Sequence, residues 1–170
     1  MYKLLFDSDA LIKASKAEFL DKTVKNFDVS ITEEVYNETV KEGKKGFYPD
    51  ADKIENFVNK GKIKVINKKY YKEKKEPEKS FGKGEKSTFQ VYKKGSLIVT
   101  DDLSFMSYIK KENIKSLSCA NLVYLLVKKK KLSKNNAYYC LEKLKPYIRK
   151  DVYKLIKKDV GESKWHKCNH

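Results

Sequence analysis

Short strand-like runs alternate with amphipathic stretches along the chain. The runs at about 2–6, 27–31, 62–66, 97–100 and 114–117 predict strands. Helical patterns occupy about 9–15, 17–25, 49–60, 84–94 and 103–111, another runs from a cap at Ser30 to about 41, and more follow at 120–130, 134–145 and 148–160. This alternation predicts an α/β fold, in which a central, mainly parallel sheet of four or five strands carries helices on both faces.

Capping residues indicate where several of these helices begin and end. Ser30 and Glu33 have the spacing of a capping box, and Pro49 is a favoured first residue of a helix. Glycines are expected just beyond three helix ends, at Gly43, Gly61 and Gly95.

The length of 170 residues suits one domain. We expect it to span residues 1–160, with a core over 1–125 and C-terminal helices over 120–160, followed by a flexible tail at 161–170. No apolar run approaches 18 residues, so no membrane span is expected. The acid at position 7 argues against a secretory signal, and three widely spaced cysteines suit a reducing cytoplasm, with Cys119 and Cys140 as buried small hydrophobes.

The chain is strongly basic, with 39 Lys and Arg against 23 Asp and Glu and a formal charge of +16. Such a charge favours a polyanionic partner, because lysine and arginine displace the counterions condensed on a phosphate backbone. A lysine-rich surface that serves only solubility is the alternative.

Acids stand where two strands of the predicted sheet end. Asp7 follows the first strand, and Asp101 and Asp102 follow the fourth. Either place suits a helix N-cap, but ligands of such sheets also bind at the carboxyl ends of strands. Asp7 and Asp102 each head the apolar stripe of the following helix, whereas Asp101 matches that phase less well.

Two further acids lie on apolar stripes. Thr88, Phe89 and Tyr92 follow Glu85 at helical spacing, and Glu38 ends a stripe. Four inward-facing carboxylates repel one another unless a cation compensates them. Mg²⁺ or Mn²⁺ would do so, since both prefer oxygen ligands.

Four segments together resemble the successive acidic motifs of PIN-domain nucleases. These are 6–12 (FDSDALI), 31–38 (ITEEVYNE), 82–85 (GKGE) and 98–102 (IVTDD), and the similarity covers about residues 1–125. The resemblance implies a three-layer, Rossmann-like PIN fold, acids gathered around Mg²⁺ or Mn²⁺, and hydrolysis of single-stranded RNA.

The resemblance also implies roles for single residues. Its acidic positions, which imply catalytic and metal-binding roles, fall on Asp7, Glu38, Glu85 and Asp102. Asp7 and Asp102 are expected as direct metal ligands, and Glu38 and Glu85 as ligands or water-positioning groups. Three secondary positions join them: Ser8 as the hydroxyl beside the first acid, Thr100 of the Thr-x-Asp motif, and Asp101 as an added charge. The sequence departs from the family pattern at Asp9, where Asn or Ser is commoner, and at Glu85, where many members carry Asp.

The functional prediction is therefore a metal-dependent endoribonuclease. Three alternatives stay open: an inactive RNA-binding module of the same fold, a toxin held inactive by a small antitoxin protein, and a nuclease acting on structured DNA. Homodimerisation also stays open, since members of this family often self-associate.

Other features carry weaker functional hypotheses. Tyr70 and Tyr71 lie among lysines in the charged stretch 67–83, and with Lys83 and Lys86 they could contact RNA. The alternative is a solvated loop. The run 128–131 (KKKK) either complements a helix dipole or contacts RNA.

Three candidate ligand motifs are less specific. His166, Cys168 and His170 could bind Zn²⁺ but lack the paired spacing of such sites, so a frayed tail is favoured. The stretch 82–87 lacks the spacing of a phosphate-binding loop, and no Gly-x-Gly-x-x-Gly follows the first strand, so NTPase and dinucleotide-binding functions are excluded.

Overall fold

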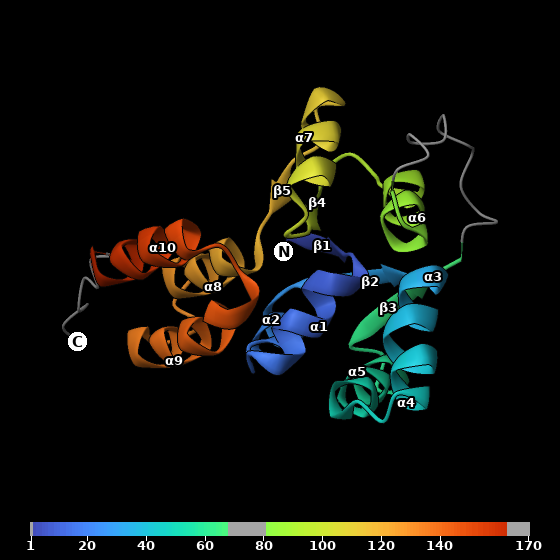
Figure 1. Ribbon diagram of the computed structural model, residues 1–170, viewed down its shortest axis with the longest axis horizontal. Helices are drawn as coiled ribbons and strands as arrows, with labels where there is room; N and C mark the ends of the chain where they lie inside the picture. Colours follow the sequence, from blue (N-terminus) through green and yellow to red (C-terminus); the bar gives the residue numbers. More distant parts are fainter. Residues whose placement is uncertain (1, 68–80, 163–170) are drawn as a thin grey trace.

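A computed structural model describes residues 2–67 and 81–162 of the chain. Its centre is a parallel sheet of five strands in the order β3-β2-β1-β4-β5 (Figure 1). The strands are β1 (Lys3–Phe6), β2 (Asp28–Thr32), β3 (Ile63–Ile66), β4 (Ser96–Val99) and β5 (Ser116–Leu117). The predicted parallel sheet is confirmed.

Helices connect the strands and follow the last of them. Between β1 and β3 lie α1 (Ser8–Lys16), α2 (Leu20–Asn26), α3 (Glu33–Tyr36), the π-helix η1 (Asn37–Glu42), α4 (Gly43–Lys45) and α5 (Pro49–Asn59). Either side of β4 come α6 (Lys83–Val91) and α7 (Leu103–Lys111). The chain then forms α8 (Cys119–Lys128), α9 (Lys134–Leu144), the 3₁₀ turn η3 (Lys145–Tyr147) and α10 (Lys150–Glu162). Figure 1 shows α8, α9 and α10 packed together beside the sheet.

The central strand β1 is buried on both faces, and its successive side chains point to opposite sides of the sheet. Leu4 and Phe6 of β1 join a large core with α1, α2 and α8. Leu5, between them in the sequence, joins a smaller core with Phe105 of α7 and residues of α6. Two cores on opposite faces of one sheet confirm the expected three-layer α/β fold.

The helix after β2 begins and ends at other residues than the sequence predicted. Its N-cap is Thr32, whose hydroxyl accepts from the amide of Val35 at 3.2 Å, so the capping box at Ser30 is wrong. Ser30 lies inside β2, and pairing with β1 outweighs its capping preference. Gly43 does not end the helix: it is buried against Ala51 of α5, and a methyl group there would lie 2.9 Å from the Ala51 Cβ.

The helix before β4 is shorter than predicted. It ends at Val91, and Gly95 lies in the following turn with φ of +94°. Gly61, in contrast, follows α5 as expected, with φ of +65°.

The structure tests only part of what the sequence predicted about the cysteines, the tail and membrane spans. Cys119 and Cys140 are buried, as predicted. Helix α10 reaches Glu162, two residues into the stretch expected as a tail, and the remainder of that stretch lies outside the described residues. In the part of the chain that the structure describes, no helix is long and apolar enough to cross a membrane.

The smaller core gives a stability prediction. Phe105 is fully buried and its ring lies 5.4 Å from that of Phe81, so Phe105→Ala should lower the free energy of unfolding by about 3–5 kcal/mol. Leu103, on the same helix, is 53 % exposed, and Leu103→Ala should change the free energy of unfolding by less than about 1 kcal/mol. Urea unfolding followed by circular dichroism measures both; equal losses would contradict the assigned burial.

Candidate functional site

The first acid and the Thr-x-Asp segment lie side by side because β1 and β4 are neighbouring parallel strands. Asp7 directly follows β1, and its amide donates to the carbonyl of Val99, the last residue of β4, at 3.1 Å. Thr100 follows Val99 and is fully buried, and its amide donates to the carbonyl of Leu117 of β5 at 3.0 Å. Sheet pairing therefore fixes both residues at the carboxyl edge.

The Asp7 carboxyl group is buried and only 2 % exposed. Its Oδ1 accepts from the amide of Ala10 at 2.8 Å, which caps α1, and it is also hydrogen-bonded to the Thr100 side chain. Burial raises its pKa to about 7 and outweighs these two hydrogen bonds, which lower it; the negative charges of Asp9 and Glu85 raise it further. Asp7 thus caps a helix, as the simpler interpretation expected, and is also a carboxyl that titrates near neutral pH.

The Thr100 hydroxyl connects two of the predicted acids. It is hydrogen-bonded to the Asp7 carboxyl group and accepts from the backbone amide of Asp102 at 3.2 Å. This single buried side chain is therefore bonded to both segments.

Glu38 reaches the start of α1 from a distant segment. The Ser8 hydroxyl donates to Glu38 Oε2. Glu38 belongs to the π-helix η1, whose wider turn changes the phase between α3 and α4. No periodicity in the sequence signalled this π-helix, although the stripe ending at Glu38 placed the residue on the correct element.

Helix α6 packs closely against Ser8 and Glu38. A methyl group on Gly84 would lie 2.7 Å from Glu38 Oε2 and 2.8 Å from Ser8 Oγ, so alanine there would require these side chains to shift. Glu85 follows in the same turn, and its Oε2 lies 2.6 Å from where a Cβ of Gly82 would stand. Because Glu85 also raises the pKa of Asp7, α6 brings a third carboxylate to the site.

Asp101 and Asp102 differ in burial and in their hydrogen-bond partners. Asp102 is exposed and caps α7: its Oδ1 accepts from the amide of Phe105 at 2.7 Å and from Ser104 Oγ at 2.6 Å. These bonds, with the Phe105 amide foremost, lower the pKa of Asp102. Asp101, expected as the weaker match, is more buried, and its Oδ1 accepts from the amide of Cys119 at 3.0 Å.

Lys13 is a cation that the sequence analysis did not single out. Its Nζ lies 2.5 Å from Asp9 Oδ2 and 3.4 Å from Asp101 Oδ2, and its side chain is only 12 % exposed. Burial lowers its pKa, but the bond to Asp9 and the charge of Asp101 outweigh this and raise the pKa overall. The spacing of Asp9 and Lys13 four residues apart on a helix was the available signal.

The site is bordered by a cavity of about 280 Å³ that the C-terminal segment helps to form. Asp101, Lys13 and Leu103 line one side, and Tyr147, Arg149 and Leu155 line another. The segment after residue 133 therefore builds part of the surroundings of the acids.

The predicted RNA-contacting residues are placed only in part. Lys83 is exposed and Lys86 is half-buried, both in the first turn of α6 beside Glu85. Tyr70 and Tyr71 lie outside the described residues, as do His166, Cys168 and His170.

The structure thus brings Asp7, Glu38 and Glu85 to one edge of the sheet, with Asp102 joined to them through Thr100. Within residues 2–67 and 81–162, no three carboxylate, imidazole or thiol groups are arranged so that they could hold a metal ion. The donors nevertheless suit a hard divalent cation, because all are oxygens and a cation would favour the charged form of the buried Asp7.

The burial of Asp7 predicts a pH-dependent stability. The folded state keeps the Asp7 proton up to a pKa of about 7, whereas the unfolded chain releases it near the ordinary 3.8, so stability falls as pH rises between these values. Asparagine can cap α1 without a charge. Asp7→Asn should therefore raise the free energy of unfolding by about 2–4 kcal/mol at pH 8, and by almost nothing at pH 4. Urea unfolding in a chelator measures this; a difference independent of pH would contradict it.

Comparison with known proteins is consistent with this geometry. A family model described as a PIN domain matches residues 3–162. No curated protein matches the chain. The family match covers every segment that supplies an acid, and it extends through α9 and α10, beyond the residues 1–125 over which the sequence resemblance was seen.

Proposed function

The chain belongs to the PIN-domain family, a family of nuclease-type folds that generally uses divalent metal ions, and we propose that it is a metal-dependent endoribonuclease that hydrolyses single-stranded RNA. The observation that carries the proposal is the buried Asp7 carboxyl group after β1, whose pKa is raised to about 7, with the charge of Glu85 acting on it and Glu38 bound to the adjacent Ser8.

Mg²⁺ or Mn²⁺ is the proposed cofactor. Asp7, Glu38, Glu85 and Asp102 would hold it, since their oxygens suit a hard cation. When bound, such an ion would polarise the scissile phosphate and lower the pKa of a bound water molecule. No histidine lies among the described residues, so carboxylates are the acid–base groups of this edge.

The chain's own residues fix and balance these carboxylates. Ser8 donates to Glu38 and so orients one carboxylate, and Thr100 ties Asp7 to the Asp102 segment. Lys13 pairs with Asp9 and Asp101 and so offsets part of their negative charge beside the site.

RNA as the substrate is supported by charge and by the family. The formal charge of +16 favours a polyanion, although the acids occupy the proposed cleavage edge. Lys83 and Lys86 border Glu85 on α6 and are suited to contact the phosphates that flank the scissile bond.

Removing a single carboxylate tests the mechanism. Asp7→Asn, Glu38→Gln, Glu85→Gln and Asp102→Asn should each slow Mg²⁺- or Mn²⁺-dependent cleavage of a labelled single-stranded RNA by about 100-fold or more, because even groups that orient metal ligands are worth 10–100-fold. Asp52→Asn is the control: Asp52 belongs to α5 and is 77 % exposed, and its variant should keep the parent rate.

The same assay separates the alternative functions. A parent chain that binds RNA but cleaves none with either metal would indicate the inactive binding module. Faster cleavage of a matched structured DNA would contradict RNA as the substrate. Cleavage that survives Asp7→Asn would contradict the proposed site.

The close approach of α6 gives a second prediction. Gly84→Ala places a methyl group against Glu38 and Ser8, so it should lower cleavage or metal affinity about tenfold while changing the free energy of unfolding by less than about 1 kcal/mol. Gly43→Ala places its methyl group against Ala51 in the packing between α4 and α5. It should lower the free energy of unfolding and leave cleavage and metal affinity unchanged. Cleavage rates and urea unfolding of both variants check this; activity and stability lost together in Gly84→Ala would contradict it.

A further inference from the structure

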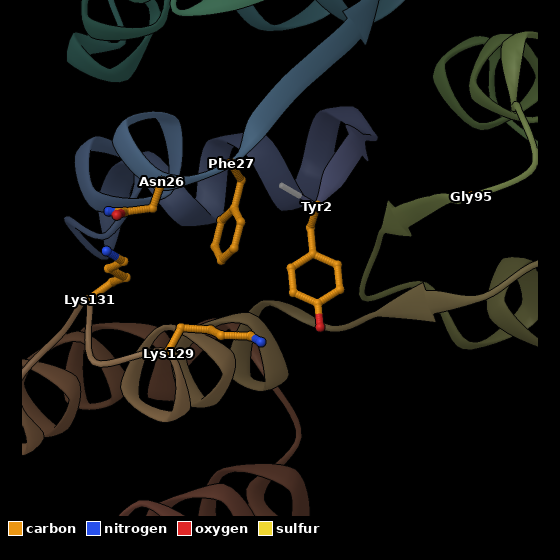
Figure 2. A pocket seen from close by; sticks show the side chains of 6 residues that line it. All are labelled: Tyr2, Asn26, Phe27, Gly95, Lys129 and Lys131. Atoms are coloured by element: carbon orange, nitrogen blue, oxygen red, sulfur yellow. The ribbon is translucent and has the colours of Figure 1, made fainter.

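A cavity of about 390 Å³ lies at the amino-terminal edge of the sheet, away from the acids. Residues just before β1, β2 and β4 and just after α8 line it: Tyr2, Asn26, Phe27, Gly95, Lys129 and Lys131 (Figure 2). Parallel strands place all their amino ends together, and β1 has four residues, so about 13 Å of strand separates this edge from Asp7. The cavity is therefore a separate place from the acidic site.

One wall of the cavity is aromatic. The rings of Tyr2 and Phe27 meet edge to face, with centroids 5.9 Å apart and planes at 64°. Phe27 is buried, whereas Tyr2 is 41 % exposed, and its carbonyl accepts from the amide of Asp28 at 3.0 Å. The buried ring and the strand pairing hold the Tyr2 ring in place while leaving part of it open to a ligand.

The opposite wall is cationic, and a fixed turn presents it. Lys130 has φ of +58°, in the left-handed region where glycine is usual, and its amide donates to the Val127 carbonyl at 2.9 Å. The amide of Lys131 donates to the Leu126 carbonyl at 2.8 Å, which completes a Schellman turn with Lys129 and Lys131 on either side of the left-handed residue. Backbone strain of this kind persists where the surroundings require it.

The two lysines beside Lys130 line the cavity. Lys129 Nζ lies 5.2 Å from the centroid of the Tyr2 ring, and Figure 2 shows Lys131 extending toward Asn26. Among the described side chains, neither lysine forms an ion pair with a carboxylate. A cation at the end of α8 is explained by its favourable interaction with the helix dipole. That interaction does not explain why an exposed aromatic ring lies opposite two such cations.

We propose that this cavity binds a nucleoside phosphate, with the base against the Tyr2 ring and the phosphate between Lys129 and Lys131. An aromatic face binds a base, and two ammonium groups that pair with no carboxylate in residues 2–67 and 81–162 bind a phosphate, whereas a simple anion would use only the lysines. The volume lies within the range of small-ligand sites. The nucleoside phosphate is either a free nucleotide or one unit of an RNA strand. The proposal does not depend on RNA hydrolysis at the acidic edge.

Binding is measured on the full chain carrying Asp7→Asn, in a chelator, so that no turnover interferes. The probes are 5′-AMP, followed by calorimetry, and a fluorescein-labelled RNA of ten adenosines, followed by anisotropy. The test variants are Lys129→Ala/Lys131→Ala and Tyr2→Leu, with Tyr2→Phe as the variant that keeps the aromatic ring.

The chain supplies a matched control for the lysine pair. Lys60 and Lys62 flank Gly61 in a turn with the same two backbone bonds, from Gly61 to Val58 at 2.9 Å and from Lys62 to Phe57 at 2.8 Å. Both are exposed, and neither lines this cavity. Lys60→Ala/Lys62→Ala removes the same charge from the same kind of turn.

The lysine pair and the Tyr2 ring should each contribute to binding of the probes. Lys129→Ala/Lys131→Ala should weaken binding about tenfold and reduce the salt slope for RNA by about 1.4. Tyr2→Leu should weaken binding about tenfold, with Tyr2→Phe and the control pair within about twofold of the parent. Variant-sensitive binding of 5′-AMP would identify a free nucleotide, and variant-sensitive binding of RNA alone would identify a unit of a strand. If neither probe binds, or if either test variant binds as the control pair does, the proposal is overturned.

Discussion

The burial of the Asp7 carboxyl group is the constraint on which the rest of the site depends. It is the most buried acidic side chain that the structure describes, and its surroundings do not fully compensate its charge, so burial raises its pKa to about 7. A protein that only needed a cap for α1 could use an exposed aspartate, as α7 does with Asp102. Holding a carboxyl group in this position costs stability, and this cost is understandable when the group serves a cation.

Sheet topology is what allows several segments to surround Asp7. Strand β1 is central in the order β3-β2-β1-β4-β5, so the chain leaves neighbouring strands on both sides of it at the same edge. Segment 100–102 comes from β4 on one side, and Glu38 follows β2 on the other. Helix α6 then completes the arrangement through the close approach of Gly84. The acids gather because of strand order, although nearly a hundred residues separate the first from the last.

The two edges of the sheet differ in charge. Carboxylates meet at the carboxyl edge, and at the amino edge Lys129 and Lys131 stand opposite Tyr2. A polyanion is repelled by the first edge unless a cation is present, while the second edge attracts it without one.

Local sequence determined most of the secondary structure and the identity of the candidate acids. Helix α7 spans the predicted residues 103–111, because its apolar stripe and its Asp102 cap agree. Local signals were wrong where tertiary packing outweighed them: Ser30 pairs in β2 instead of capping, and Gly43 allows α4 to pack on α5 instead of ending a helix.

The geometry of the site was decided by the tertiary structure. The sequence placed Asp7, Glu38, Glu85 and Asp102 on their elements, because helical phase and strand ends are local properties. It did not reveal the π-helix that carries Glu38, the bridge of Thr100 between two segments, or the pairing of Lys13 with Asp101. These depend on distances between residues far apart in the chain, and only the packing of β4, α1 and α6 around β1 fixes such distances.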